Sequence, residues 1–234
     1  TCGSQFTESA RPPEHCPICE DERQYVNPDG QQWTTLEALR SSHKVIIKPE
    51  EPGLYSVNTE PKFAIGQRAF LIQSPGGNVL WDCIAPLDEP TIARIRELGG
   101  IAAIAVSHPH YYSTMVEWSR AFDNAPIHLH EDDRRWVMRP DPCIRFYSDG
   151  RGALMAGDQP QICPDSKWVS YMYSYPNYIP LNATAIRHIL TCLDPLPYDR
   201  IYGAFFLRGK GVVTTGGKEV VQRSAERYLR SIQS

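Results

Sequence analysis

The sequence contains no apolar run close to the roughly 20 residues that a membrane-spanning helix requires. Its first residues, TCGSQFTESARPPEHC, also lack the apolar core of a signal peptide. Lysine and arginine number 24 against 27 acidic residues, and the two signs are interspersed, so no basic surface points to nucleic acid or to a membrane. We therefore expect a cytoplasmic protein that binds a small-molecule substrate; the sequence does not indicate an oligomeric state.

Paired cysteine motifs are scarce, because only Cys16 and Cys19 of the seven cysteines have a motif spacing. The odd total argues against a disulfide framework. A C-x-x-C turn brings two thiolates to one metal, which predicts a structural zinc site. No second C-x-x-C or H-x-x-x-H follows, so the other ligands would come singly, from His43 or His15. Buried reduced thiols, or a redox motif without the usual preceding strand, are the alternatives.

The chain length of 234 residues suits one large domain or two small ones. A hydrophobic fraction of 41% with 10% aromatic residues is enough for a core. We expect residues 1–14, which are polar and contain two prolines, to form a flexible tail. Residues 15–50 would form a cysteine-containing knuckle with a short helix, and 51–234 the main domain.

Hydrophobic periodicity and turn residues predict alternating helices and strands after residue 50. His128 and His130 share one strand face, which we interpret as half-exposed, with His130 bonded to the neighbouring carboxylates. Residues 44–52 are predicted to be irregular. The predicted helices are 34–41, 91–98, 113–122, 131–137, 181–193 and 218–232, and the predicted strands are 53–58, 70–73, 79–83, 101–106, 127–130, 144–147, 152–157 and 200–206.

The stretch SHPHYYSTMVEW carries the strongest functional signal, because His108 and His110 follow a buried strand. Ligands of α/β proteins bind at the carboxyl ends of strands, and neutral imidazole is the commonest metal ligand. The pattern predicts half of a metal site; two polar residues of a surface loop are the alternative. Thr114 and Glu117 have the spacing of a capping box, which predicts a helix start.

This stretch resembles the metal-binding loop of the metallo-β-lactamase-fold hydrolase family, whose pattern is His-x-His-x-Asp-His. His108 and His110 match the first two histidines, Tyr112 stands at the Asp and Ser113 at the last His. The resemblance implies an α/β fold, an αββα sandwich, with one metal ion, zinc, rather than two. It runs from about Cys16 to the C-terminus, as a divergent HPHYY branch with WTTLEAL, EPKFAIGQRAFL, WVSYMYSYPN and RIYGAFF.

The resemblance also implies roles for four residues outside the two histidines. Asp82 matches an Asp near the metal loop and would orient it; capping the next turn is the alternative. Asp158 matches the carboxylate that completes the metal site and would orient the attacking water. Tyr111 or Tyr112 would donate a hydrogen bond to the oxyanion.

The third metal histidine of the family has no counterpart here. Only four residues separate Tyr147 from Gly152, where the family places tens, and no histidine occurs between Glu131 and Arg187. The last family histidine is also absent, around Gly203. We expect a fold shortened after residue 147, either in a degenerate member or through loss of an internal segment near 148–149.

Two functions from different classes follow from this pattern. The first is metal-dependent hydrolysis of an ester, lactone or thioester carbonyl. The second is a non-catalytic scaffold that binds a small molecule or a protein partner through the tyrosine-rich segment Tyr171–Tyr178, with at most a structural zinc.

Overall fold

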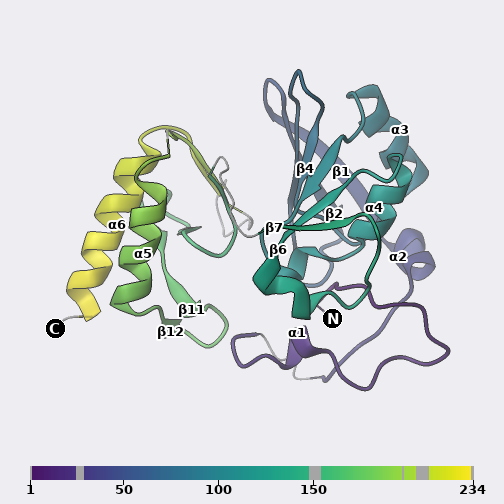
Figure 1. The fold of residues 1–234 in the computed structure, drawn as a ribbon, viewed down its shortest axis with the longest axis horizontal. Helices are drawn as coiled ribbons and strands as arrows, with labels where there is room; N and C mark the ends of the chain where they lie inside the picture. The colour runs from purple at the N-terminus through teal and green to yellow at the C-terminus, as the bar shows by residue number, and fades with distance from the viewer. Residues whose placement is uncertain (1, 25–28, 148–153, 197, 204–210, 233–234) are drawn as a thin grey trace. The chain divides into compact units, whose positions relative to one another are not determined.

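The computed structural model describes residues 2–24, 29–147, 154–196, 198–203 and 211–232 (Figure 1). The chain forms two compact units. The first is Thr1–Asp21 with Val26–Gly150, and the second is Glu22–Tyr25 with Arg151–Ser234. The border predicted between residues 50 and 51 falls inside the first unit.

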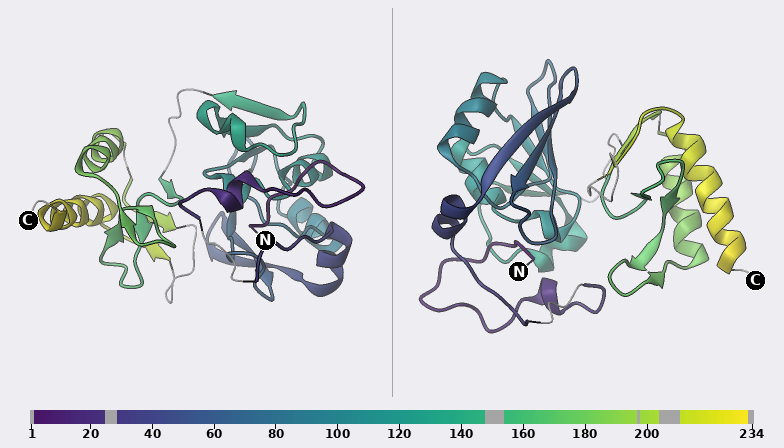
Figure 2. Two further views of the ribbon diagram at one scale, coloured as in Figure 1. Left: turned by 90° about the horizontal axis from the view of Figure 1, so that it is seen from below. Right: turned by 180° about the vertical axis from the view of Figure 1, so that it is seen from behind.

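A seven-stranded sheet, in the order β1 to β7, organises the described part of the first unit. Neighbours are antiparallel from β1 to β4 and parallel from β4 to β7. The β1–β2 hairpin is the longest pair (Figure 2). The strands are Lys44–Glu51, Leu54–Glu60, Ala69–Ile72, Val79–Trp81, Ala103–Ala105, Ile127–His130 and Ile144–Tyr147.

Helices α3 (Glu89–Glu97) and α4 (Met115–Ala121) make the crossovers between parallel strands and lie on one face of the sheet (Figure 1). Asp88 caps α3 by accepting from the amide of Thr91. Trp118 of α4 is fully buried and donates to the carbonyl of Ile84. The core between helices and sheet consists chiefly of Val57, Leu71, Leu80, Ile95, Ile104, Trp118, Ile127 and Leu129.

The start of α4 was predicted correctly, but the capping box was wrong. Thr114 is the N-cap residue, and its side chain makes no capping hydrogen bond. Its buried hydroxyl donates instead to the carbonyls of Ile84 and Ala85. Glu117 pairs with Arg139 rather than turning back to the helix terminus. Tertiary partners therefore replace the local ones.

Residues 44–52 were predicted to be irregular, and this prediction was wrong. They form β1, which pairs with β2. Most of its residues are exposed or half-buried, and it contains Pro49 and four charged residues. Strand β1 lies at the edge of the sheet and is held by backbone pairing to one neighbour. Because its side chains are not buried, its sequence shows no apolar alternation.

The first residues of the predicted tail contact the loop before α4. Cys2 is buried, and the carbonyl of Gly3 accepts a hydrogen bond from the Ser113 hydroxyl. The amide of Gln5 donates to the carbonyl of Ser113. The segment is held because its backbone pairs with the loop before α4.

Two short helices follow it, α1 (Pro17–Glu20) and α2 (Leu36–Ser42), the latter capped by Thr35.

The second unit contains α5 (Ala183–Leu193) and α6 (Gly217–Ile232), which lie side by side (Figures 1 and 2). Within the described residues a three-stranded sheet has the order β14-β13-β8. The core includes Ile162, Tyr171, Ile186, Ile201 and Val221. The short strands are β8 Met155–Ala156, β9 Gln161–Ile162, β10 Val169–Ser170, β11 Met172–Ser174, β12 Ile179–Pro180, β13 Ile201–Gly203 and β14 Val212–Val213.

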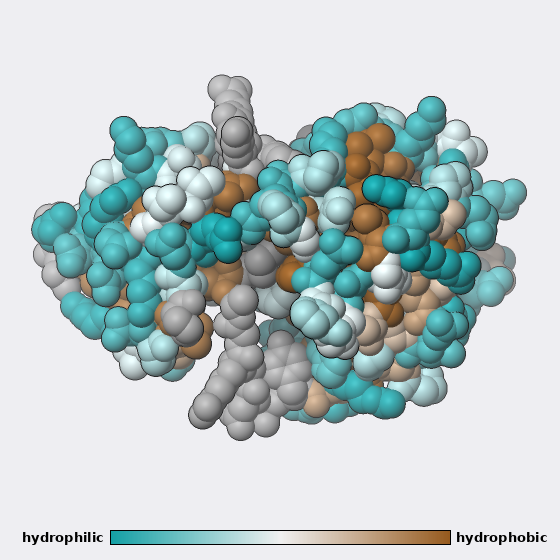
Figure 3. Space-filling view, turned by 90° about the horizontal axis from the view of Figure 1, so that it is seen from above, coloured by the Kyte–Doolittle hydropathy of each residue, from teal (hydrophilic) through white to brown (hydrophobic). Residues whose placement is uncertain are grey.

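Among the described residues, no helix combines the length and the apolar character needed to cross a bilayer. The face in Figure 3 is mostly hydrophilic in both units, with hydrophobic residues between the polar ones.

Gly77, in the β3–β4 turn, has a positive φ of 115°, and an added Cβ would stand 2.5 Å from the Cβ of Ala102. We expect Gly77→Ala to lower the free energy of unfolding by about 2–3 kcal/mol, from backbone strain and overpacking. Urea unfolding measures this. Gly76→Ala is the matched control, because an added Cβ there would come no closer than 3.8 Å to the Ser74 hydroxyl. Equal midpoints for the two variants would contradict the prediction.

Candidate metal centres

Three parallel strands bring polar residues to one edge of the first unit's sheet. Asp82 follows β4, Ser107 and His108 follow β5, and His130 ends β6. Because β4, β5 and β6 are parallel neighbours, their carboxyl ends meet at the same edge. This is the position in which the sequence pattern predicts a ligand site.

Asp82 fixes the beginning of the histidine loop. Its side chain is fully buried, and its backbone has the left-handed φ of 63°, which Asp tolerates better than most residues. One carboxylate oxygen accepts from the amide of Ser107 at 2.8 Å, and the other from the Ser107 hydroxyl at 3.1 Å. These contacts hold the residue next to His108, as an orienting role requires.

His108 and His110 lie close together at the end of β5. His108 caps the short 3₁₀ helix η1 (Pro109–Tyr111), and its Nδ1 accepts from the amide of His110. The two rings are stacked, with centroids 5.0 Å apart, and their Nδ1 atoms are separated by 3.2 Å.

That separation of ring nitrogens has two physical meanings. It is a hydrogen-bonding distance if one ring donates. It is also close to the separation of about 3.3 Å expected for two nitrogens bound at about 2.0 Å to one tetrahedral zinc. The distance alone matches two positions of a single ion; because the one lone pair of His108 Nδ1 accepts from the His110 amide, metal binding at this nitrogen requires that hydrogen bond to break.

The two tyrosines of the loop are buried and point to different neighbours. Tyr111 is fully buried near Arg68, whose guanidinium has its pKa lowered to about 10 by burial, an effect that Tyr111 opposes. Tyr112 is instead a neighbour of Asp133, and its hydroxyl opposes the rise that burial causes in the pKa of that carboxyl. Tyr112 therefore lies near the Asp133 carboxyl, whereas Tyr111 lies near the Arg68 guanidinium.

Asp133 is a site residue that the sequence interpretation missed. It lies half-buried in the 3₁₀ helix η2 (Glu131–Trp136), directly after β6. Burial raises the pKa of its carboxyl, while His108, His130 and the Tyr112 hydroxyl oppose that rise. The charge of His108 therefore influences this carboxyl. The sequence signal for Asp133 was the His-x-x-Asp pattern of His130 and Asp133, which begins at the end of β6. Strand β6 is parallel to β5, and His108 follows β5.

His130 lies at this edge too. Its Nδ1 accepts from the amide of Asp132, and its distance of 3.6 Å from a carboxylate oxygen of that residue is longer than the predicted hydrogen bond. His128 is half-buried in the middle of the same strand. The helix that separates both residues from His108 in sequence is the crossover that brings the two strand ends together.

Asp158 belongs to the second unit. It follows β8, as predicted, and its charge raises the pKa of Tyr175, to which burial contributes most. Its predicted role in completing the metal site stays a prediction.

The predicted tyrosine surface divides into buried and exposed members. Tyr171 is fully buried and donates to the carbonyl of Val221, and Tyr175 donates to the carbonyl of Ser170. Tyr173 and Tyr178 are exposed, at 42% and 84%. Only part of Tyr171–Tyr178 is therefore available to a partner.

A second group of metal-ligating atoms lies near the N-terminus. The sulfurs of Cys2, Cys16 and Cys19 all lie within 4.8 Å of one another, and those of Cys2 and Cys16 are 3.8 Å apart. Hydrogen bonds from Cys16 and Cys2 lower the pKa of Cys19, and the pKa of Cys16 is raised by its hydrogen bond to Cys19. In the described part of the chain, no other three His, Cys, Asp or Glu side chains come this close.

The predicted partners His43 and His15 are not in this group. The His43 ring packs edge-on against Phe63 and contacts the Ser42 hydroxyl. His15 is exposed and pairs with Glu20. The third sulfur of the group belongs to Cys2, which lies 14 residues before Cys16 in the sequence, a spacing that forms no recognisable motif.

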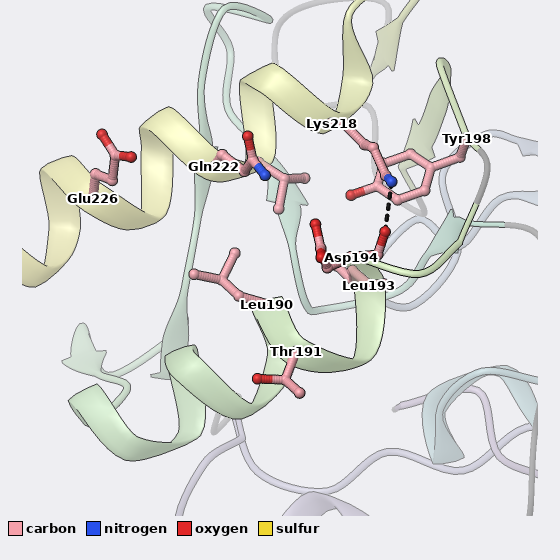
Figure 4. A pocket seen from close by; sticks show the side chains of 9 residues that line it. Leu190, Thr191, Leu193, Asp194, Tyr198, Lys218, Gln222 and Glu226 are labelled. Carbon is pink, nitrogen blue, oxygen red and sulfur yellow. Dashed lines mark hydrogen bonds between the residues drawn. The ribbon is translucent and has the colours of Figure 1, made fainter.

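Two clefts occur among the described residues, one in each unit. One, of about 660 Å³, lies in the first unit between the N-terminal segment and a wall that includes Leu39, Thr114 and Glu117. The other, of about 430 Å³, lies between α5 and α6, where Lys218 donates to the carbonyl of Asp194 (Figure 4). Neither is lined by His108 or His110.

No protein-family model matches this chain. The uncharacterized protein YmaE of Bacillus subtilis (strain 168) is 48% identical to it, and the match covers 100% of this chain and 96% of YmaE. The chain belongs to the YmaE family. The alignment extends over 267 positions, whereas the chain has 234 residues, so the relative has positions without a counterpart here.

Solved structures show which fold the YmaE family has. A mutant flavo di-iron protein from Thermotoga maritima matches with a TM-score of 0.51 at 13% identity, over 80% of this chain and 61% of that one. A second mutant of the same protein matches with a TM-score of 0.50 at 13% identity, over 80% of this chain and 62% of that one. The fold is α/β, of the metallo-β-lactamase type, as predicted. The chain spans about three fifths of the flavo di-iron protein.

Proposed function

We propose that this YmaE-family protein is a metal-dependent hydrolase of a small molecule with an ester, lactone or thioester carbonyl. The observation that supports it most is the pair of ring nitrogens of His108 and His110, 3.2 Å apart at the carboxyl edge of the parallel strands. We propose zinc as the metal because imidazole and carboxylate donors suit it. The seven free cysteines suit a reducing compartment, and we propose the cytoplasm.

The side chains present fit part of a metal site. His108 and His110 supply two ligands, and within the described residues no third donor of His, Cys, Asp or Glu lies within 4.8 Å of both. Asp133 is a half-buried carboxyl after β6 whose pKa is influenced by His108. We propose that it takes the place of the family aspartate, whose position is occupied by Tyr112.

A bound ion would supply Lewis-acid polarisation of the carbonyl and a lowered pKa of water. The protein's own residues set the geometry. Asp82 fixes Ser107, and thereby the direction in which the loop leaves β5. Asp133 orients His108 and accepts a proton from the attacking water. The Tyr112 hydroxyl would donate its one hydrogen bond to the developing oxyanion when substrate is bound.

Asp133→Asn is expected to lower hydrolysis while raising the stability of the metal-free protein. Because burial raises the pKa of Asp133 in the folded state, the folded protein binds this proton more tightly than the unfolded one. The free energy of unfolding therefore falls as the pH rises from about 4 through the raised pKa. Asparagine does not titrate and so removes this loss. The difference between the thermal unfolding midpoints at pH 7 and pH 4 should therefore be smaller in the variant than in the wild type.

The control for Asp133→Asn is Asp132→Asn, which changes a neighbouring carboxylate that is 91% exposed. A variant of Asp133 that loses both activity and stability at neutral pH would show a structural role instead.

The second candidate function is a non-catalytic scaffold. One specific observation favours it: in the described residues, the three-ligand group is made of cysteines and not of the histidines. The scaffold predicts metal at the cysteines alone and no turnover of p-nitrophenyl acetate, a γ-lactone or a thioester. Metal-dependent turnover that is lost on substitution of His108 would show that the protein is an enzyme and not a scaffold.

A further inference from the structure

The cysteine cluster has the dimensions of a metal site. Two sulfurs at about 2.3 Å from one tetrahedral zinc ion stand about 3.8 Å apart, and the sulfurs of Cys2 and Cys16 are 3.8 Å apart. Cys19 lies within 4.8 Å of both. A disulfide would instead require a sulfur–sulfur distance of about 2.0 Å.

The surroundings exclude solvent from most of the cluster. Cys2 and Cys16 are buried together with Ile18, and the rings of Phe6, Trp33 and Trp136 pack against them. The Cys16 amide donates to Glu20, which closes the turn of the C-x-x-C segment. Thiols are weak hydrogen-bond donors, so three of them in an apolar shell gain little from one another, whereas thiolates bound to zinc gain strong metal–sulfur bonds.

The cluster is connected directly to the histidine loop. The side-chain amide of Gln67 donates to the carbonyl of Cys2 at 2.8 Å and to the carbonyl of His110 at 3.1 Å. The Ser113 hydroxyl donates to Gly3, and the Gln5 amide donates to the Ser113 carbonyl. Residues 2–5 therefore pack against the histidine loop, and the buried Cys2 connects them to the cysteine cluster.

We propose that Cys2, Cys16 and Cys19 bind one zinc ion that fixes residues 2–5 against the loop His110–Ser113. The three thiolates leave one position of a tetrahedral ion for a ligand from outside this group. The ion closes the chain between residues 2 and 16 and so limits the freedom of a segment with little regular structure. This inference does not depend on the proposed hydrolase activity.

Cobalt(II) in place of zinc tests the ligand set in the full chain. The His108→Ala/His110→Ala variant, loaded with cobalt, is expected to show thiolate-to-cobalt charge-transfer absorption in the near ultraviolet. Cys2→Ser in the same background should weaken metal affinity by about 100-fold or more. Loss of a residue that only hydrogen-bonds to a metal ligand already lowers affinity by about 10–100-fold. Cys192→Ser, an exposed cysteine of α5, is the matched control and should leave the affinity unchanged.

A Cys2 variant that binds cobalt as tightly as the control would overturn the proposal. So would a count of five reactive thiols instead of seven in the denatured wild-type protein, because it would show a disulfide.

Hydrogen exchange on the His108→Ala/His110→Ala variant, which keeps all three cysteines, tests the role of the cysteine-bound ion separately from a histidine-bound ion. Removal of zinc by a chelator is expected to speed exchange of the Gln5 amide by about tenfold or more, because local opening then costs less. The amide of Ile104, in the central strand β5, is the internal control and should not change. Equal protection of Gln5 with and without zinc would contradict the anchoring role.

Discussion

The double substitution His108→Ala/His110→Ala is expected to lower hydrolysis by about 1,000-fold or more, because a Lewis-acidic ion supplies several kcal/mol of transition-state stabilisation. The measurement is kcat/KM on p-nitrophenyl acetate, a γ-lactone and an aryl thioester, with zinc in excess. His188→Ala is the matched control, since this exposed histidine lies on α5 in the second unit.

The result is informative because the two histidines lie in a loop that other residues hold in place. Asp82, Gln67 and Ser113 all contact its backbone or its neighbours, so alanine at positions 108 and 110 should leave the fold intact. Circular dichroism and the unfolding midpoint check this. A double variant with wild-type kcat/KM would show that hydrolysis occurs elsewhere in the protein.

The second large effect is expected for Asp82→Ala. The substitution removes the acceptor for both the amide and the hydroxyl of Ser107 at a fully buried position. Each buried donor left without a partner costs about 1–3 kcal/mol, and alanine at a positive φ adds strain. The free energy of unfolding should fall by about 2–4 kcal/mol in a urea titration.

Asp82→Asn serves as the graded control, because asparagine tolerates the left-handed conformation and keeps one acceptor oxygen. It should lose less stability than alanine. Ser107→Ala removes only the hydroxyl and is expected to cost about 1 kcal/mol. If all three variants unfold at the same urea concentration, Asp82 does not hold the loop.

Elements whose signal is local could be predicted from the sequence. The strand Ile127–His130 was predicted with its observed bounds, because two buried apolar residues alternate with two half-buried histidines. The hairpin of β3 and β4 followed from turn residues between two apolar runs. Helix α5 was found from its apolar periodicity, with Asn182 as the observed cap.

Elements that depend on distant partners could not be predicted in the same way. Strand β1 exists because it pairs with β2, and its own residues carry no apolar alternation. The Thr114 hydroxyl and the Glu117 carboxylate have a spacing typical of a capping box. Both are used by tertiary partners, the carbonyls before α3 and Arg139.

The same distinction applies to the site. His108 and His110 are close in sequence, so their pairing could be foreseen. Asp133 and His108 come to the same end of the sheet because β5 and β6 are parallel neighbours, and this pairing depends on a crossover helix. Cys2 joins Cys16 and Cys19 through the fold of the N-terminal segment, which has no periodic pattern.

Metal content tests the central claim, that the chain has a histidine site in addition to a cysteine site. Purified wild-type protein and the His108→Ala/His110→Ala variant would be equilibrated with zinc, desalted and analysed for bound metal. The account predicts about two equivalents in the wild type and about one in the variant, which retains the cysteine site. The same zinc content in both proteins would contradict it and leave the histidine loop without a metal.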